Sequence, residues 1–335
     1  MILSGTDPAA LEAAARALAQ GELVGLPTET VYGLGADADN PQAVARVYAA
    51  KGRPSDHPLI VHVTDASQVD HYAVRVPELA RRLIAAHWPG TLTLILPRRP
   101  GVAQASAGGQ DSIGLRCPSH PVAQALLRAA RDQGVHGVAA PSANRFGRVS
   151  PTTAQHVEDE LGQDLLILDG GACEVGIEST IVDCTREHPV LLRPGMLTPD
   201  QLSASAGVPV LTPEAYARQS AQVAAAPRAS GTLESHYAPQ ARVHLLDAPR
   251  LQARLMELVQ GSAPVQVGVW ARTLPPARPG VVMQAMPSDP VACAQVLFAQ
   301  LRAFDQQGVT DILVETPPAD VAWDGVRDRL TRAAA

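Results

Sequence analysis

The 335-residue sequence contains very little lysine and asparagine. Lys51 is the only lysine, since the other 26 of the 27 basic residues are arginine, and asparagine occurs only at Asn40 and Asn144. Such a bias accompanies a genome that avoids A/T-rich codons, so the residues that remain are candidates for roles that no substitute can fill. Lysine carries a compact point charge, which contacts a phosphate oxygen where a planar guanidinium does not fit. Lys51 is therefore the first functional candidate.

A purely structural role for Lys51 stays open. Asn40 followed by Pro41 is typical of a helix start, an N-cap residue and then proline at the first helical position. Lys51 and Arg53 fall where that helix should end, and cations at a helix C-terminus complement its dipole. Asn40 itself shows that a scarce residue can serve as a cap.

The sequence also lacks long apolar runs and metal-binding cysteine patterns. No run approaches the roughly 18 apolar residues of a membrane span, and the first residues show no charged region leading into an apolar one. We therefore expect a cytoplasmic protein without a membrane segment. The four cysteines have no Cys-x-x-Cys spacing and no companion histidines arranged as metal ligands, so we interpret them as core residues and expect no protein-held metal.

An excess of positive charge is absent as well. Residues 1–207 carry 16 Lys and Arg against 22 Asp and Glu, and the remainder carries 11 against 11. This balance argues against a basic nucleic-acid domain, and no stable DNA binding is expected. A few converging cations that hold a small anionic ligand remain compatible with it, because local placement makes such a pocket.

The length suggests about two domains, and a change in composition shows where they divide. Alanine, serine, glycine and proline dominate much of residues 208–240. We expect a catalytic domain over 1–207, a linker or lid over 208–240 and a small parallel-sheet domain over 241–335. The last lacks a Gly-x-Gly-x-x-Gly turn, so it is not predicted to bind a dinucleotide.

Alternating strand and helix patterns predict an α/β fold for both domains. The segment 27–35 (PTETVYGLG) is expected to be a turn-rich loop whose two glycines permit close approach to a ligand. Expected strands lie at 23–26, 59–63, 91–96, 112–117, 135–140, 165–168, 180–183, 242–246, 265–270, 281–285 and 311–315. Expected helices lie at 8–20, from 41 to about 51, 77–87, 121–131, 248–260 and 289–307.

Five motifs in order carry a resemblance to a known family. They are PTETVYGL at 27–34, KGRP at 51–54 with PL at 58–59, PGT at 89–91, PSAN at 141–144 and ESTI at 178–181. Together they resemble the YrdC/Sua5 family over the whole chain, and HYAP at 236–239 resembles a later landmark of the long, two-domain form. The resemblance implies a twisted open mixed sheet with a concave, positively charged cavity, joined to a smaller Rossmann-like domain.

The resemblance also implies an activity. The family makes L-threonylcarbamoyladenylate from L-threonine, bicarbonate and ATP, with Mg²⁺ accompanying the ATP, and releases pyrophosphate. The product serves the t6A modification of tRNA, so a tRNA threonylcarbamoyl transferase is the expected downstream partner. The linker departs from the family pattern, because it reads ASGTLESH at 229–236 in place of a stretch rich in Ser-Pro-Gly-Met.

Matching positions give the expected site. The catalytic candidates are Lys51 and Arg53. The expected ATP-side residues are Lys51, Arg53, His57, Ser142, Asn144, Ser150, Arg193, His236 and Tyr237. The expected threonine-side residues are Thr30, His62, Arg116, Ala140 and Ser179. An isolated Ser-x-Asn or strand histidine is more often structural, and that alternative stays open for Ser142, Asn144 and His62.

The chemistry of the implied reaction requires positioning more than acid–base catalysis. The threonine amine captures CO₂ as a carbamate, whose oxygen then attacks the α-phosphate, so the protein must align two anions and stabilise the pyrophosphate that leaves. No general base is therefore named. Two alternatives remain: a double-stranded RNA binding module, whose binding would fall steeply with salt, and an ATP-dependent carbamoyl transferase, which would require carbamoyl phosphate.

Overall fold

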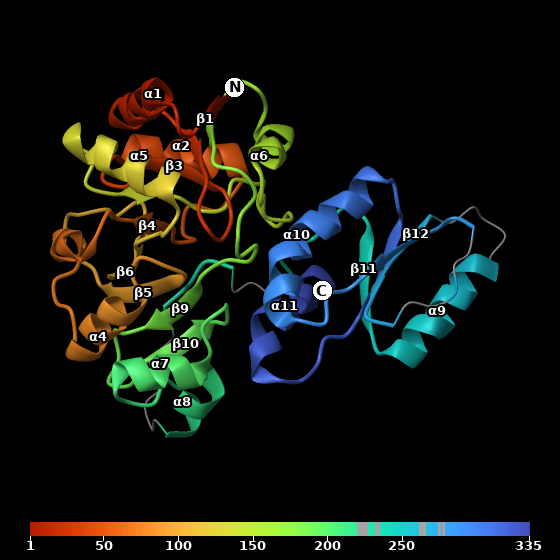
Figure 1. Ribbon diagram of the computed structural model, residues 1–335. Coiled ribbons are helices and arrows are strands. Elements are labelled where there is room, and N and C mark those ends of the chain that lie inside the picture. The colour runs from red at the N-terminus through yellow and green to blue at the C-terminus, as the bar shows by residue number, and fades with distance from the viewer. Residues whose placement is uncertain (220–226, 232–234, 261–265, 274–275, 277–278) are drawn as a thin grey trace. The chain divides into compact units, whose positions relative to one another are not determined.

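The computed structural model describes residues 1–219, 227–231, 235–260, 266–273, 276 and 279–335. It divides into two compact units (Figure 1). The first comprises Met1–Phe146 and Ser150–Thr232, and the second comprises Gly147–Val149 and Leu233–Ala335. Within the described ranges, no helix is both long enough and apolar enough to cross a membrane.

The first unit is built on a ten-stranded mixed sheet, as the sequence predicted. The strand order is β1-β8-β2-β3-β7-β4-β6-β5-β9-β10. The strands are β1 (Ile2–Ser4), β2 (Val24–Leu26), β3 (Gly33–Asp37), β4 (Ile60–His62), β5 (Leu92–Pro97), β6 (Ser112–Arg116), β7 (Val138–Ala139), β8 (Leu166–Asp169), β9 (Thr180–Asp183) and β10 (Val190–Arg193). Parallel pairs such as β4 with β6 alternate with antiparallel pairs such as β5 with β6.

Helices connect these strands. They are α1 (Pro8–Ala19), α2 (Pro41–Lys51), α3 (Val69–Tyr72), α4 (Glu78–His87), α5 (Pro121–Asp132), α6 (Ala154–Leu161), α7 (Pro199–Ala206) and α8 (Pro213–Gln219). Of these, α1, α2, α5, α6 and α7 start at residues whose side chains cap them. For α2 the predicted cap is confirmed, because the Asn40 side chain accepts hydrogen bonds from the backbone N–H groups of Gln42 and Ala43. The helix ends at Lys51, and Gly52 follows with a left-handed φ of 62°.

Strand β3 begins inside the 27–35 segment that the sequence analysis treated as a loop. Its residues 33–35 pair antiparallel with β2, and residues 36–37 pair antiparallel with β7. A Cβ on Gly35 would lie 2.8 Å from Leu26 Cδ2 and 2.9 Å from Val138 Cγ1, so glycine is required by packing rather than by backbone conformation. The glycines that suggested a loop in fact permit a tightly packed strand.

Apolar side chains cover the sheet beneath its helices. One cluster joins α1 and α5 to the sheet through Leu18, Val24, Leu126, Val138 and Leu168. A second cluster includes Val61, Leu94 and Leu115, which alternate along their strands with the residues of the candidate site. All four cysteines are free and buried, as the sequence analysis predicted.

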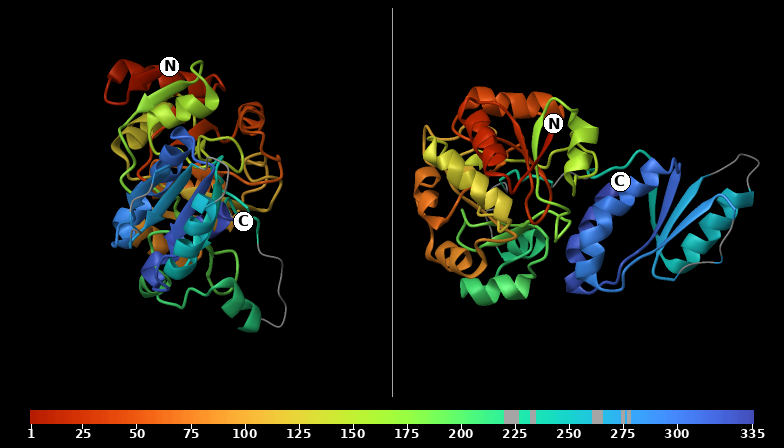
Figure 2. Two further views of the ribbon diagram at one scale, coloured as in Figure 1. Left: turned by 90° about the vertical axis from the view of Figure 1, so that its right-hand side faces the viewer. Right: turned by 45° about the horizontal axis from the view of Figure 1, so that its top comes forward.

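The second unit contains a four-stranded parallel sheet of order β11-β14-β12-β13. Its elements are β11 (Arg242–Leu246), α9 (Ala248–Gln260), β12 (Val267–Ala271), β13 (Val281–Ala285), α10 (Pro290–Gln306), β14 (Asp311–Glu315) and α11 (Asp324–Ala333). Figure 2 shows α9 on one face of this sheet and α10 with α11 on the other. On the α10 face, a Cβ on Gly268 would lie 2.7 Å from a ring carbon of Phe304, which explains the glycine. The predicted Rossmann-like parallel sheet is confirmed.

Candidate active site

One face of the central strands carries the polar residues of the candidate site. Residues opposite each other in neighbouring strands share a face, so the pairs His62↔Arg116 and Thr93↔Arg116 bring three polar side chains together. Gly114, two residues before Arg116, continues the same face and lies opposite Ile60 and Ile95. The alternation of side chains along β4, β5 and β6 therefore builds a polar end and an apolar end of one surface.

Arg116 is held at the polar end by residues of the 27–34 motif. Its Nη2 donates to Glu29 Oε1 at 2.6 Å, its Nη1 donates to Thr30 Oγ1 at 2.8 Å and its Nε donates to the Gly90 carbonyl at 3.2 Å. Both charged side chains are only 5% exposed. A guanidinium has five N–H groups, so these bonds orient Arg116 and leave two N–H groups for a substrate.

Glu29 is the buried counter-charge of Arg116, and sequence reasoning did not assign it a role. Burial alone would raise the pKa of its carboxyl, but the charge of Arg116 and their hydrogen bond outweigh burial and lower it. Glu29 Oε2 also accepts a hydrogen bond from Ser119 N at 3.2 Å. Glu29 is therefore an ionised residue that positions Arg116 and not a proton acceptor.

His62 lies next to Arg116 as a neutral imidazole. Its side chain is buried, and burial together with the charge of Arg116 lowers its pKa to about 3. Among the described residues, no group bonds to its Nδ1, although that atom is inaccessible to solvent. Buried polar atoms are nearly always hydrogen-bonded, so the unpaired Nδ1 is an exception among the described residues.

Ser179 joins the polar end to Arg193. Its hydroxyl lies 2.7 Å from Thr93 Oγ1, and Arg193 Nη2 donates to both its hydroxyl, at 3.1 Å, and its carbonyl, at 2.8 Å. Arg193 is buried at the end of β10. The predicted threonine-side residues Thr30, His62, Arg116 and Ser179 thus lie on one connected surface with an ATP-side arginine.

Lys51 is more deeply enclosed than the sequence suggested. Its side chain is buried, and Nζ donates to the carbonyl of Ser142 at 2.6 Å and to the carbonyl of Asn144. The Lys51 carbonyl in turn accepts from Phe146 N at 2.8 Å. Lys51 therefore fixes the 142–146 loop to the end of α2, which is a role that the motif spacing alone did not reveal.

The charge state of Lys51 depends on this enclosure. Burial, and then the charge of Arg53, lower the pKa of the Lys51 amine well below its usual value, while Glu160 and Glu178 act in the opposite direction. Two of the three donors of an ammonium group reach carbonyls of the loop. One donor remains for a ligand when the amine is protonated.

Arg53 and His57 belong to the loop that follows α2. Arg53 Nη2 donates to the Pro58 carbonyl at 2.8 Å, and its guanidinium lies 5.6 Å from the centre of the Phe146 ring. His57 meets the same ring edge-on, with 5.5 Å between centroids, and burial lowers its pKa. The Phe146 ring thus packs against both of these predicted ATP-side residues.

The remaining candidates of the first unit, Ala140, Ser142 and Ser150, lie in the loop that follows β7. Ser142 bridges to Gly33, and Ala140 N donates to the Ile60 carbonyl at 3.0 Å. Ser150 Oγ donates to Glu178 Oε1 at 2.5 Å, which places a second unassigned carboxylate beside a predicted ATP-side residue.

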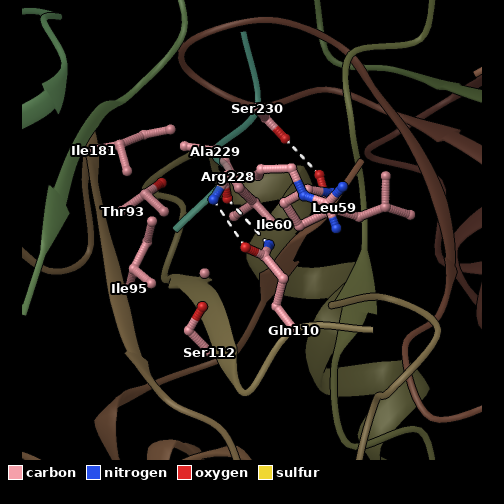
Figure 3. Close-up of a pocket in the computed structure, with 12 residues that line it drawn as sticks. Leu59, Ile60, Thr93, Ile95, Gln110, Ser112, Ile181, Arg228, Ala229 and Ser230 are labelled. Carbon is pink, nitrogen blue, oxygen red and sulfur yellow. Dashed lines mark hydrogen bonds between the residues drawn. The ribbon is translucent and has the colours of Figure 1, made fainter. Parts of the chain in front are cut away.

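Arg53 and Arg193 converge on one residue of the linker. Arg53 Nη2 donates to Ser230 Oγ at 3.2 Å, and Arg193 Nη1 donates to the Ser230 carbonyl at 2.9 Å. Ser230 also closes one end of a pocket on the apolar part of the sheet face (Figure 3). That pocket is lined by Pro58, Leu59, Ile60, Thr93, Ile95, Gln110, Ser112, Gly114, Ile181, Arg228, Ala229 and Ser230.

His236 and Tyr237 belong to the second unit. His236 N donates to the Arg332 carbonyl at 3.1 Å, and the Tyr237 ring packs 5.2 Å from Phe298 and 5.5 Å from the Arg329 guanidinium. Tyr237 adopts a left-handed φ of 65°, which is unusual for a bulky residue. The assignment of both residues to the nucleotide stays a prediction.

Metal ligands do not cluster in the described ranges, where no group of three or more His, Cys, Asp or Glu side chains could hold an ion. Glu29, Thr93 and Glu178 escaped sequence reasoning as site residues. Glu29 and Glu178 stand inside the quoted motifs, so their position was visible, but their burial and partners depend on tertiary pairing.

Comparison with known families identifies the family of the chain. The Sua5/YciO/YrdC family model, described as telomere recombination, matches residues 16–195, and a model of the threonylcarbamoyl-AMP synthase C-terminal domain matches residues 198–335. The chain belongs to the two-domain Sua5 family. Membership assigns to this Sua5-type chain the activity of threonylcarbamoyl-AMP synthesis, a nucleotidyl transfer in the t6A modification of tRNA.

Relatives of this Sua5-type chain match it over most of its length. A threonylcarbamoyl-AMP synthase of Bacillus subtilis (strain 168) is 39% identical, over 99% of this chain and 94% of its own. One of Schizosaccharomyces pombe is 36% identical, over 97% and 88%. The crystal structure of Pyrococcus abyssi Sua5 complexed with L-threonine superimposes with a TM-score of 0.84 at 35% identity, covering 97% of this chain and 94% of that one.

Proposed function

We propose that the first unit binds L-threonine and ATP on one face of its sheet and joins them, through a carbamate, into L-threonylcarbamoyladenylate. The observation that carries this proposal is the convergence of Arg53 and Arg193 on one point beside the Arg116 surface. Two arginines that meet at one point suit a polyphosphate, and an oriented arginine nearby suits a carboxylate.

The polar end of the sheet face would hold threonine. The two N–H groups of Arg116 that remain would bind the substrate carboxylate, since Glu29 and Thr30 fix the guanidinium in one orientation. His62 Nδ1 would take up the hydroxyl or the amine, because it is buried, neutral and without a described partner. Ser179 and the backbone at Ala140 complete the proposed threonine side.

The neighbouring cations would hold the nucleotide. In this proposal Arg53 and Arg193 contact phosphate oxygens, and Lys51 supplies one donor while it holds the 142–146 loop in place. The proposed ATP side consists of Lys51, Arg53, His57, Ser142, Asn144, Ser150 and Arg193, with His236 and Tyr237 from the second unit.

The chemical step then follows from positioning. The threonine amine adds to CO₂ derived from bicarbonate and loses a proton, which gives a carbamate. A carbamate oxygen attacks the α-phosphate, the bond to the β-phosphate breaks, and pyrophosphate leaves. Correct alignment can lower such a barrier by about 7 to 11 kcal/mol, so the reaction needs no nucleophilic side chain.

Magnesium would accompany the ATP rather than occupy a site made only by protein. Mg²⁺ is commonly held by one or two carboxylates together with substrate phosphates. Glu178 is the carboxylate proposed here, because it lies beside the proposed ATP-side residue Ser150 and its charge acts to raise the pKa of Lys51. When bound, the ion would neutralise charge that develops on the departing pyrophosphate.

The wider assignment follows from this chemistry. We propose residues 1–207 as the catalytic domain, 208–240 as a linker that closes as a lid, and 241–335 as a second domain that anchors it. Of the proposed lid, residues 220–226 and 232–234 lie outside the described part of the chain. A cytoplasmic tRNA threonylcarbamoyl transferase would receive the product.

Incubation with labelled bicarbonate, ATP and single amino acids tests the function. We expect label to enter an adenylate, with one pyrophosphate formed for each adenylate, only when threonine is present. ADP released in stoichiometric amount would contradict adenylation and support a phosphoryl-transfer route. Dependence on carbamoyl phosphate, with indifference to threonine, would instead indicate a carbamoyl transferase.

A further inference from the structure

The linker residues Arg228, Ala229 and Ser230, called the strap below, lie across the apolar end of the sheet face. Figure 3 shows them above the pocket into which Thr93 and Ile95 point. Among the described residues, different kinds of contact hold the two ends of the strap. The contacts at the Arg228 end and at the Ser230 end differ in chemistry, and this difference suggests how the position of the strap is controlled.

Gln110 holds the Arg228 end through the main chain alone. Gln110 Oε1 accepts from Arg228 N at 2.8 Å, and Gln110 Nε2 donates to the Arg228 carbonyl at 3.2 Å (Figure 3). One primary amide thus pairs with both backbone groups of a single residue, as a neighbouring β-strand would. No other uncharged side chain except asparagine, which is shorter, can offer this pair of bonds.

The side chain of Arg228 adds a weaker contact. It lies 2.5 Å from Asp56 Oδ2, but the two side chains are 51% and 57% exposed. Exposed ion pairs contribute little because water and salt screen them. The Gln110 amide is therefore the more important anchor at this end of the strap.

The Ser230 end is held by groups that an anionic substrate would also bind. Arg53 and Arg193 both donate to Ser230, whose own hydroxyl donates to the Pro58 carbonyl at 2.8 Å. Phosphate oxygens accept stronger, charge-assisted hydrogen bonds than a serine hydroxyl or a backbone carbonyl does. Bound polyphosphate would compete with Ser230 for the arginines, whereas the uncharged amide of Gln110 makes no comparable charge-assisted bond to a phosphate.

We propose that Gln110 is a positioning residue that fixes the strap over the pocket beside the proposed substrate site while the Ser230 end exchanges with the phosphates. The strap would then pivot at Arg228 instead of leaving the cavity when nucleotide binds. This inference rests on the proposed function for its meaning, but the contact itself is independent of catalysis. A strap fixed in this way keeps water from the adenylate, which is otherwise hydrolysed.

Limited trypsin digestion measures the strap directly, because cleavage after Arg228 requires its backbone to leave Gln110. The test variants are Gln110→Ala, which removes both bonds, and Gln110→Glu, which replaces the donor to the Arg228 carbonyl with an acceptor. We expect cleavage after Arg228 at least about tenfold faster in both variants, by the loss of two hydrogen bonds. Cleavage after Arg218 should be unchanged and serves as the internal reference.

Asp56→Asn is the matched control, because it removes the ion pair at the same strap residue and keeps the Gln110 amide. We expect it to change cleavage after Arg228 less than about threefold. In the Gln110 variants, the adenylate recovered per pyrophosphate released should fall several-fold, while the Asp56 variant retains the parental ratio. Circular dichroism and thermal melts establish that each variant is folded.

The outcomes separate this inference from the proposed function. Gln110 variants that resist trypsin and keep the parental ratio of adenylate to pyrophosphate would overturn the role of Gln110 in an active enzyme. If Asp56→Asn opens the strap as far as Gln110→Ala does, the anchor is the ion pair and the inference is wrong. Faster cleavage of Gln110 variants in a protein that forms no adenylate would support the anchor and refute the function.

Discussion

At the scale of single residues, the contacts of Lys51 predict that arginine will not take its place. Its amine reaches two carbonyls of one loop from a buried position. A point charge can serve both carbonyls, whereas a planar guanidinium is larger and directs its donors in a fixed fork. The scarcity of lysine drew attention to this residue, but only tertiary structure shows the partners that Ser142 and Asn144 provide.

Lys51→Arg should therefore reduce synthesis by at least about 100-fold, equivalent to about 2.7 kcal/mol of barrier. The sequence suggested that folding would be unaffected, because a helix terminus accepts either cation. The buried position changes that expectation, and overpacking should lower the free energy of unfolding by about 1 to 3 kcal/mol. Pyrophosphate release and urea unfolding measure the two effects.

Arg46→Lys is the matched control, since Arg46 lies on the exposed side of the same helix and pairs with Glu22. It should leave both measurements at the parental values. Full synthesis by the Lys51→Arg protein would return Lys51 to the role of an ordinary helix-terminal cation.

His62 predicts a pH dependence of stability. Its folded-state pKa is about 3, below the ordinary value of 6.5, so between these values the unfolded chain binds more protons. The free energy of unfolding therefore falls as the pH decreases below 6.5, with a contribution from His62 of at most about 1.4 kcal/mol per pH unit. Urea unfolding of the parental protein and of His62→Gln, at pH 5 and pH 7, isolates this contribution. An equal loss of stability in both proteins would contradict the low pKa.

At the scale of elements, β3 and its glycines set the shape of the site. Gly35→Ala should lower the free energy of unfolding by about 1 to 3 kcal/mol, because its Cβ would lie within 3 Å of Leu26 and Val138 side-chain atoms. Gly114→Ala is the comparison: its Cβ would meet its nearest neighbour, Ile60, at an ordinary 3.5 Å. The free energy of unfolding of the Gly114→Ala protein should then be unchanged. Its added methyl group should make the pocket that Gly114 lines smaller and so raise KM for one substrate. Equal melting temperatures for the two variants would contradict the packing argument.

Regular elements with strong local signals were predictable from the sequence. Asn40 and Pro41 marked the start of α2, and β-branched runs marked β5 and β9. Strand β3 was not predictable, because its glycines are dictated by close packing against residues distant in the sequence. Helix α6 also escaped prediction, although Thr153 caps it and accepts a hydrogen bond from His156 N.

Prediction of the site was limited in the same way. The family resemblance pointed to Arg116 and Arg193, which lie outside the quoted motifs, but the partner that orients Arg116, Glu29, is fixed only when the strands assemble. Gln110 carried no signal at all, since a glutamine in a loop is usually exposed, and its function depends on a segment 118 residues further along the chain.

At the scale of the whole molecule, the boundary between the units gives a test of the lid. Residues 228–230 belong to the first unit, although they lie in the linker. A chain that ends at residue 232 keeps the strap, whereas one that ends at residue 227 loses it. We expect the longer truncation product to retain more adenylate per pyrophosphate than the shorter one, and both to fall below the full chain. Identical ratios in all three proteins would make the linker a simple tether.

The enclosure of Lys51 also makes the protein unusual toward amine chemistry. The chain carries only two primary amines, the N-terminal one and that of its single lysine. The lysine is 3% exposed. While the loop around Lys51 is closed, acylating reagents and amine-directed cross-linkers should therefore modify the N-terminus alone. Opening of the loop exposes the amine and removes the burial that lowers its pKa, so the amine then reacts as an ordinary accessible lysine. The extent of acylation at this one atom would therefore record, without any engineered probe, how often the loop around it opens.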